Sequence, residues 1–390
     1  MPKWGSMFWC MRDVLLKSWK RKKRKNSLSF SQNLSVFKRC YTVEVNEIIS
    51  YLKSYDGSEL KLMEICGTHT ASIFKNGIRD LISPKIKLIS GPGCPVCVTP
   101  SAYIDKCIEY AKKDDHSLLT FGDMMKVQGT EGSLSDMKSE GASVELMYSP
   151  FEAIEKAREH PEHTYVIGAV GFETTVPSYA LLAEQAAAMD IENIKMVTAL
   201  KAIIPALQWI CENETDIDGF ICPGHVSVVI GCRIYEEMAS KYNKPFVVAG
   251  FEAEHLLAAI YDIVRQTECG RGEVRNLYKN VVKDDGNIRA KGVISRCFET
   301  NDAFWRGLGK IEHSGLFLKA ELKKYDGGSL GLDTDVELPD GCKCGSVITG
   351  RINPDECPMF GTKCDPLKPF GPCMVSAEGA CGIWYRNKSR

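Results

Sequence analysis

The stretch CGTHT, residues 66–70, places a thiol, an imidazole and two hydroxyls directly after the apolar run KLMEI at 61–65. The run reads as a buried strand, so Cys66 lies where a strand ends and a helix begins. The partial positive charge of a helix N-terminus, together with His69, predicts a lowered pKa for Cys66. A thiolate there would serve as a nucleophile or as a soft metal ligand. The alternatives are a buried cysteine that packs as a small hydrophobe and a histidine that only caps the helix.

A second group is the C-P-V-C pair of Cys94 and Cys97, which follows the apolar run IKLIS at 86–90. The C-x-x-C spacing is typical of a redox dithiol or disulfide, or of half a metal site. No second C-x-x-C is present to complete a four-cysteine zinc site. The pair therefore favours redox chemistry, with a metal site or inert packing as alternatives.

A third group is the C-terminal fifty residues, which are rich in glycine and proline and have little helical periodicity. Such a segment cannot build a core of its own, so we expect a metal or cluster to organise it. The wide intervals between its cysteines suit a [4Fe–4S] cluster better than zinc; unligated thiols are the remaining alternative. The six cysteines of this tail are Cys342, Cys344, Cys357, Cys364, Cys373 and Cys381.

Polar residues also follow other strand-like runs. Glycine turns carrying a carboxylate or an imidazole come after the runs at 117–121, 164–170, 218–222 and 245–249. Open α/β sheets place their sites at the carboxyl ends of strands. We therefore predict one functional cleft between two α/β units, lined by Cys66 and the C-P-V-C pair and also by Thr68, Asp123, Glu173, His225 and Glu252.

The elements that must position these residues alternate between strand-like and helix-like segments from residue 60 to 265. This alternation predicts an α/β protein with two Rossmann-like units, each with a mainly parallel sheet, plus a small C-terminal iron–sulfur domain. The expected organisation is a basic, disordered extension at 1–40, a first α/β domain at 41–150 and a second at 151–270. A connecting segment and the cysteine-rich domain fill 271–390.

Charge separates the N-terminal extension from the rest of the chain. The first forty residues hold eleven Lys/Arg and one acid, whereas the other 350 hold 38 basic and 49 acidic side chains. An acidic body gives no nucleic-acid footprint, and no apolar run reaches the roughly 18 residues of a membrane span. We expect a cytoplasmic protein.

Together these motifs resemble the HypD family of hydrogenase maturation proteins. The resemblance rests on MEICGTHT, GPGCPVCVTP, FGDMM, GFETT, PGHVSVVIG, VVAGFE, WRGLG and CPMFGTKC…PCMVSAEGAC, which occur in the family's order from about residue 44 to the C-terminus. KVQGT and FEAEHLL are small departures that concern loop geometry.

The resemblance implies a scaffold with redox activity, rather than a conventional turnover enzyme, on which the Fe(CN)₂CO group of [NiFe]-hydrogenases is assembled. Cys66 would bind the iron together with a cysteine of the small chaperone HypC, and HypE would supply cyanide from a thiocyanate. The protein would act as a monomer within a heterocomplex that serves the hydrogenase large subunit through the chaperone. The tail would hold a [4Fe–4S] cluster through Cys344, Cys357, Cys364 and Cys381, with Cys342 and Cys373 as the less certain pair.

On this interpretation Cys94 and Cys97 relay electrons from the cluster during cyanide attachment, and His69 orients or protonates the transferred group. Cys66 and the Cys94–Cys97 pair should then share one cleft, with the tail packed behind the pair. One rival is a ferredoxin-linked thiol–disulfide oxidoreductase, which leaves Cys66 without a role. Another is a non-catalytic adaptor whose tail binds zinc.

Overall fold

The structure is a computed structural model that describes residues 44–388 except 337 and 339. The basic extension predicted for residues 1–40 therefore lies outside the described residues. The helix α3 (Val45–Ser54) comes first in the described chain, and Leu52–Arg390 form one compact unit.

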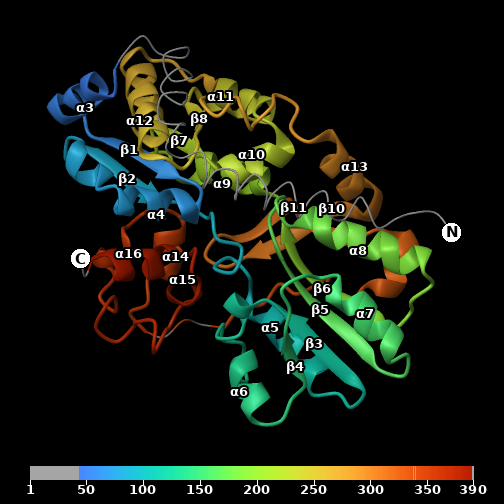
Figure 1. Cartoon of the computed structure of the whole chain (residues 1–390). Coiled ribbons are helices and arrows are strands. Elements are labelled where there is room, and N and C mark those ends of the chain that lie inside the picture. The colour runs from blue at the N-terminus through green and yellow to red at the C-terminus, as the bar shows by residue number, and fades with distance from the viewer. Residues whose placement is uncertain (1–43, 337, 339, 389–390) are drawn as a thin grey trace, which may run out of the picture. The chain divides into compact units, whose positions relative to one another are not determined.

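Two sheets form the framework of this unit (Figure 1). The first sheet is entirely parallel and has the order β2-β1-β7-β8-β9. Its strands are short and, apart from the edge strand β9, mainly buried and apolar, as expected for a parallel sheet covered on both faces. They are β1 (Leu60–Glu64), β2 (Ile86–Ser90), β7 (Gly219–Cys222), β8 (Phe246–Val248) and β9 (Val274–Asn276).

The second sheet is mixed and has the order β10-β11-β6-β5-β3-β4. Four of its strands are parallel, whereas β11 pairs antiparallel with both β6 and β10. The strands are β3 (His116–Thr120), β4 (Val144–Leu146), β5 (Thr164–Gly171), β6 (Ile194–Lys201), β10 (Phe298–Trp305) and β11 (Gly309–Leu318).

Helices connect most of the parallel strands, as β-α-β units require. The helices of the α/β region are α4 (Gly67–Lys75), α5 (Ser101–Ala111), α6 (Leu134–Ser139), α7 (Glu152–Glu159), α8 (Val176–Ala188), α9 (Ile203–Asn213), α10 (Gly224–Ile230), α11 (Glu236–Tyr242), α12 (Ala253–Glu268) and α13 (Ile288–Cys297). The tail adds α14 (Cys344–Ile348), α15 (Pro372–Val375) and α16 (Ala380–Lys388).

The α/β class, the two parallel units and the strands predicted from residue 60 to 250 are confirmed, but their division at residue 150 is wrong. β3 and β4, which precede residue 150, pair in one sheet with β5 and β6, which follow it. β1 and β2 belong instead with β7, β8 and β9. Local patterns mark a buried strand but not its partner, because every strand of a covered parallel sheet looks alike.

The interpretation of residues 271–297 and 298–318 as a connecting segment is also corrected. The hairpin of β10 and β11 completes the second sheet, and β9 completes the first. The hairpin was missed because exposed polar residues interrupt the buried ones irregularly along β10 and β11, which is a weaker signal than a continuous apolar run.

One hydrophobic core joins the first sheet to the tail. Met63 and Ile65 of the β1 region, the Cys94–Cys97 loop and the cysteines of the tail belong to the same buried cluster. Figure 1 shows the red C-terminal helices beside α4, and α16 contacts α4. The tail is therefore packed against the carboxyl end of the first sheet, where β1 and β2 end.

Candidate functional site

Cys66 is the residue that joins β1 to α4. It has an extended backbone and forms the N-cap of α4, and its carbonyl accepts hydrogen bonds from the amides of His69 (2.9 Å) and Thr70 (3.1 Å). The next residue must be glycine, because a Cβ on Gly67 would lie 2.2 Å from the carbonyl oxygen of Glu378. The tail thus covers the first turn of α4 at backbone contact distance.

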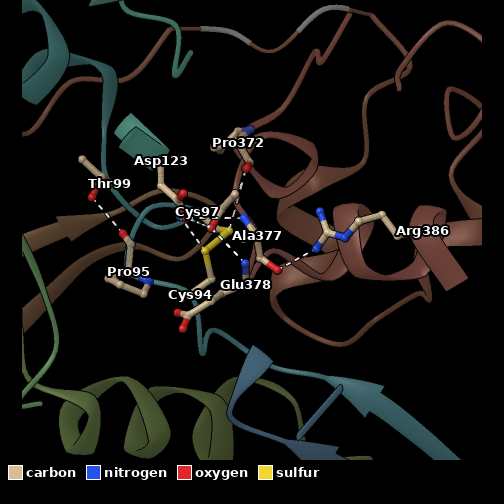
Figure 2. Close-up of a disulfide and its surroundings, with 10 residues drawn as sticks. Cys94, Pro95, Cys97, Thr99, Asp123, Pro372, Ala377, Glu378 and Arg386 are labelled. Atoms are coloured by element: carbon tan, nitrogen blue, oxygen red, sulfur yellow. Dashed lines mark hydrogen bonds between the residues drawn. A yellow bond between two sulfur atoms is a disulfide. The ribbon is translucent and has the colours of Figure 1, made fainter. Parts of the chain in front are cut away.

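The Cys94–Cys97 pair forms a disulfide with its Cα atoms 5.3 Å apart. The loop that carries it lies against the end of β1, because a Cβ on Gly93 would lie 2.3 Å from the carbonyl oxygen of Ile65. On the other side, Cys97 Sγ lies 3.9 Å from the carbonyl oxygen of Pro372 in the tail. Figure 2 shows the disulfide beside Pro372 and the Ala377–Glu378 segment of the tail.

A single cavity unites the first two cysteine groups. Its lining includes Cys66, Cys94, Cys97 and, from the tail, Cys373. The volume is about 10 Å³, close to the space that one water molecule needs. The prediction that Cys66 and the Cys94–Cys97 pair share one cleft with the tail packed behind them is confirmed.

Asp123 holds the tail in this position. Its Oδ2 accepts hydrogen bonds from the Ser376 hydroxyl (3.1 Å) and the Ala377 amide (3.4 Å), and Arg386 donates to the Ala377 carbonyl (2.7 Å). Figure 2 shows these residues around the segment that leads to Glu378. Asp123, from the loop after β3, therefore belongs to the structure that closes the cavity, although it does not line it.

The six cysteines of the tail line a second cavity of about 20 Å³. The thiols of Cys344 and Cys373 are hydrogen-bonded, which lowers the pKa of Cys344 and raises that of Cys373. Among the described residues, no three metal-ligating side chains converge on one ion position; the thiols are instead spread around the cavity. Cys373 lines both cavities, so the two cysteine sites are neighbours.

The protonation state predicted for Cys66 is wrong in direction. Burial raises the pKa of the Cys66 thiol, the Thr68 side chain and the amides of Thr68 and His69 lower it less, and the negative charge of Glu378 adds to the rise. The helix N-terminus does contribute as expected, but the cost of burying a charge exceeds it.

His69 is fully buried and lies outside the cavity lining. Its ring packs 4.8 Å from that of Phe251, which stacks on His225 at 4.2 Å. Burial lowers the pKa of His69 to about 4, and the backbone of Ala249 and Gly250 opposes this only in part. The neutral ring of His69 therefore packs the first turn of α4 against the loop that follows β8.

Three of the predicted cleft residues lie elsewhere than the cavity. Glu173 is buried and accepts a hydrogen bond from the Ile203 amide (2.9 Å) at the start of α9, and burial raises its pKa to about 7. His225 is exposed. Glu252 is exposed and lies 3.5 Å from His255. They surround the carboxyl ends of the strands, but they do not line the sulfur cavity.

Glu64 is a site residue that the sequence prediction missed. It lines the sulfur cavity, is 1% exposed, and accepts a hydrogen bond from Ser90 (3.2 Å) beside Arg79 (3.6 Å). Burial raises its pKa to about 7 despite the neighbouring Arg79. The available signal was a lone carboxylate inside the otherwise apolar stretch LMEI.

Comparison with known proteins gives the family. The model of the family described as "HypD: Hydrogenase formation hypA family" matches residues 43–388. The chain belongs to the HypD family. It is 40% identical to the hydrogenase maturation factor HypD of Escherichia coli over 350 residues, which cover 89% of this chain and 94% of that protein. The HypD of Rhodobacter capsulatus is 42% identical over 333 residues (83% and 88% of the two chains).

This HypD-family chain is accordingly a hydrogenase maturation factor. None of the helices formed by the described residues combines the length and the apolar character that crossing a bilayer requires.

Proposed function

We propose that this HypD-family protein is the scaffold on which the Fe(CN)₂CO cargo of [NiFe]-hydrogenases is assembled, with Cys66 as an iron ligand. A HypC-type chaperone would supply a second cysteine and a HypE-type protein the cyanide. The cargo would then pass to the hydrogenase large subunit through the chaperone. The protein would take part in this heterocomplex as a monomer, in the cytoplasm. The observation that carries the proposal is the single cavity lined by Cys66, Cys94 and Cys97.

Cys66 suits the role of iron ligand because a thiolate is a strong, soft donor. Its raised pKa means that metal binding must displace a proton. Glu64 lines the same cavity and is buried, so its carboxyl group is available within the site. His69 would act by holding the first turn of α4 rather than by protonating the transferred group, since it is buried against Phe251.

The Cys94–Cys97 pair would supply the two electrons that release cyanide. In the overall reaction, the thiolates of Cys94 and Cys97 reduce the sulfur–carbon bond of a protein thiocyanate. The products are the thiolate of that protein, a cyanide ion and the Cys94–Cys97 disulfide. The disulfide returns to two thiols by taking up two electrons and two protons. On this proposal, the Cys94–Cys97 disulfide would correspond to the product of the first half of that cycle.

The tail cavity would hold the [4Fe–4S] cluster, and its thiols fit such a group because each cysteine binds a different iron of the cluster. When bound, the cluster would supply electrons one at a time from a low-potential electron donor. We assign Cys344, Cys357, Cys364 and Cys381 as its ligands. Because the thiol of Cys344 is hydrogen-bonded to that of Cys373, Cys342 competes with Cys344 for the fourth ligand position. The iron and sulfide contents of Cys342→Ser and Cys344→Ser show which of the two cysteines is the ligand.

A ferredoxin-linked thiol–disulfide oxidoreductase is the alternative function. It would use the disulfide and the tail cavity in the same way, but it would need no thiol at position 66. The position of Cys66 in the disulfide's own cavity favours the scaffold.

The test is complementation of an Escherichia coli strain that lacks its own HypD. We expect Cys66→Ser to abolish hydrogenase activity, whereas Cys269→Ser, at an exposed free cysteine, should restore it like the wild type. Full activity with Cys66→Ser would contradict the scaffold and favour the oxidoreductase.

A further inference from the structure

Arg306 is a buried cation that the proposed function does not yet use. It lies in the turn between β10 and β11, within the motif WRGLG, and is 3% exposed. A fully buried arginine is costly unless it is paired. Its guanidinium binds Asp335 through Nε (3.0 and 2.9 Å) and Nη2 (2.6 Å), a bidentate geometry that fixes both side chains.

The same turn contacts both cysteine sites through its backbone. The Arg306 amide donates to the Val98 carbonyl (2.9 Å), one residue after Cys97. On its other side, a Cβ on Gly307 would lie 2.9 Å from the Cα of Gly345, the residue after Cys344. The WRGLG turn thus lies between the disulfide loop and the start of α14.

Asp335 is anchored independently of Arg306. It accepts a hydrogen bond from the Ser101 amide (2.9 Å), and the Ser101 hydroxyl accepts one from the Val336 amide (2.8 Å). The ion pair is therefore held at the start of α5, which follows the disulfide loop. The pair is also adjacent to the tail cavity, because Gly307, the residue after Arg306, contacts Gly345, and Gly345 follows the cavity-lining Cys344.

We propose that Arg306 is an electrostatic positioning residue, which with Asp335 sets the reduction potential of the redox group in the tail cavity. Uptake of one electron adds one negative charge to that cavity, and a buried cation nearby stabilises the reduced form. Net charge around a cluster is among the factors that determine its potential. The inference rests on the proposed function, because it takes the tail cavity to hold the iron–sulfur cluster.

Replacing either member of the ion pair should shift the reduction potential of the cluster, and the two shifts should have opposite signs. Arg306→Gln removes the cation and leaves Asp335, so the potential should fall. Asp335→Asn leaves Arg306 without its counter-charge and keeps an acceptor for the Ser101 amide, so the potential should rise. Arg306→Lys retains the charge and should stay nearest the wild type. We expect about a tenfold change in the ratio of reduced to oxidised cluster at a fixed potential, which is about 59 mV for a one-electron couple.

The experiment is a dithionite titration of the full-length, anaerobically purified protein, followed by electron paramagnetic resonance, after iron and sulfide analysis. Arg296→Gln is the matched control, because it breaks an exposed ion pair with Glu184 and should leave the potential unchanged. If Arg306 and Asp335 act only in folding, replacing them would change the iron and sulfide content. The reduction potentials of Arg306→Gln and Asp335→Asn would then not shift in opposite directions.

Opposite shifts in Arg306→Gln and Asp335→Asn support the inference. Shifts in the same direction, or shifts no larger than that of Arg296→Gln, overturn it while leaving the proposed function intact. If Arg306→Gln does not fold, Asp335→Asn and Arg306→Lys decide the matter, with a raised and an unchanged potential respectively. A wild-type protein without iron and sulfide overturns the proposed cluster, and this inference with it.

Discussion

Burial decides the protonation of the titratable side chains around the sulfur cavity. Cys66, Glu64 and Glu173 all have raised pKa values, and His69 has a lowered one, each with desolvation as the largest cause. Cys66 is therefore a neutral thiol at rest, and Glu64, with a pKa of about 7, is only partly ionised at neutral pH, which differs from an exposed thiolate at a helix end. A neutral Cys66 is an unreactive thiol until a partner or a metal displaces its proton.

His69 gives a prediction for stability against pH. Its pKa is lowered from 6.5 to about 4 in the folded protein. Between pH 6.5 and about pH 4, His69 is therefore protonated in the unfolded chain but neutral in the folded chain. The contribution of a neutral His69 is thus present above pH 6.5 and is lost as the pH falls to about 4. It amounts to about 3 kcal/mol over that range.

Urea unfolding at pH 7.5 and at pH 4.5 measures this effect. The loss of unfolding free energy between the two should be smaller in His69→Gln than in the wild type. Equal losses in the two proteins would mean that His69 is accessible to protons in the folded state.

At the scale of elements, the site is closed by the tail segment that Asp123 and Arg386 hold over α4. The cavity beneath it has room for about one water molecule, far less than an iron with three diatomic ligands requires. On the scaffold account, the segment of residues 376–379 must move before the cargo can bind. Its two hydrogen bonds to Asp123 are the contacts that such a movement breaks first.

Asp123→Asn should therefore loosen the cover. A hydrogen bond to a charged group contributes about 1.5–3 kcal/mol, so we expect amide exchange in residues 376–386 to quicken by at least about tenfold. Hydrogen exchange followed by mass spectrometry measures this, with Asp136→Asn, which alters only the capping box of α6, as the matched control. Unchanged exchange in the tail would show that Asp123 does not hold it.

At the scale of the whole molecule, the chain passes from the first sheet to the second, back to the first and again to the second before it reaches the tail. The strands between residues 60 and 250, the α/β class and the shared cavity were predictable, because apolar runs and the polar residues that follow them are local signals. The pairing of β1 with β7 and of β5 with β3 was not, since buried parallel strands carry no mark of their partner. Glu64 and Arg306 were missed because their roles depend on contacts between distant segments.

The tail supplies a prediction at this same scale. Its cysteines share one hydrophobic core with the first sheet, but the segment itself has few regular elements, so the proposed cluster should organise it. Removal of iron with an oxidant and a chelator should expose the six tail cysteines to alkylation, whereas Cys107 and Cys222, buried in the α/β units, stay protected. Equal protection of the tail before and after treatment would contradict a folding role for the metal.

The central claim is that Cys66 binds the iron that carries cyanide and carbon monoxide. Infrared spectroscopy of the anaerobically purified protein, co-expressed with its HypC-type chaperone, tests it most directly, because iron-bound cyanide and carbonyl absorb where protein groups do not. The account predicts such bands in the wild type and in Cys269→Ala, and their loss in Cys66→Ala. Bands that persist in Cys66→Ala, or a silent spectrum from wild-type protein with an intact iron–sulfur cluster, would contradict it.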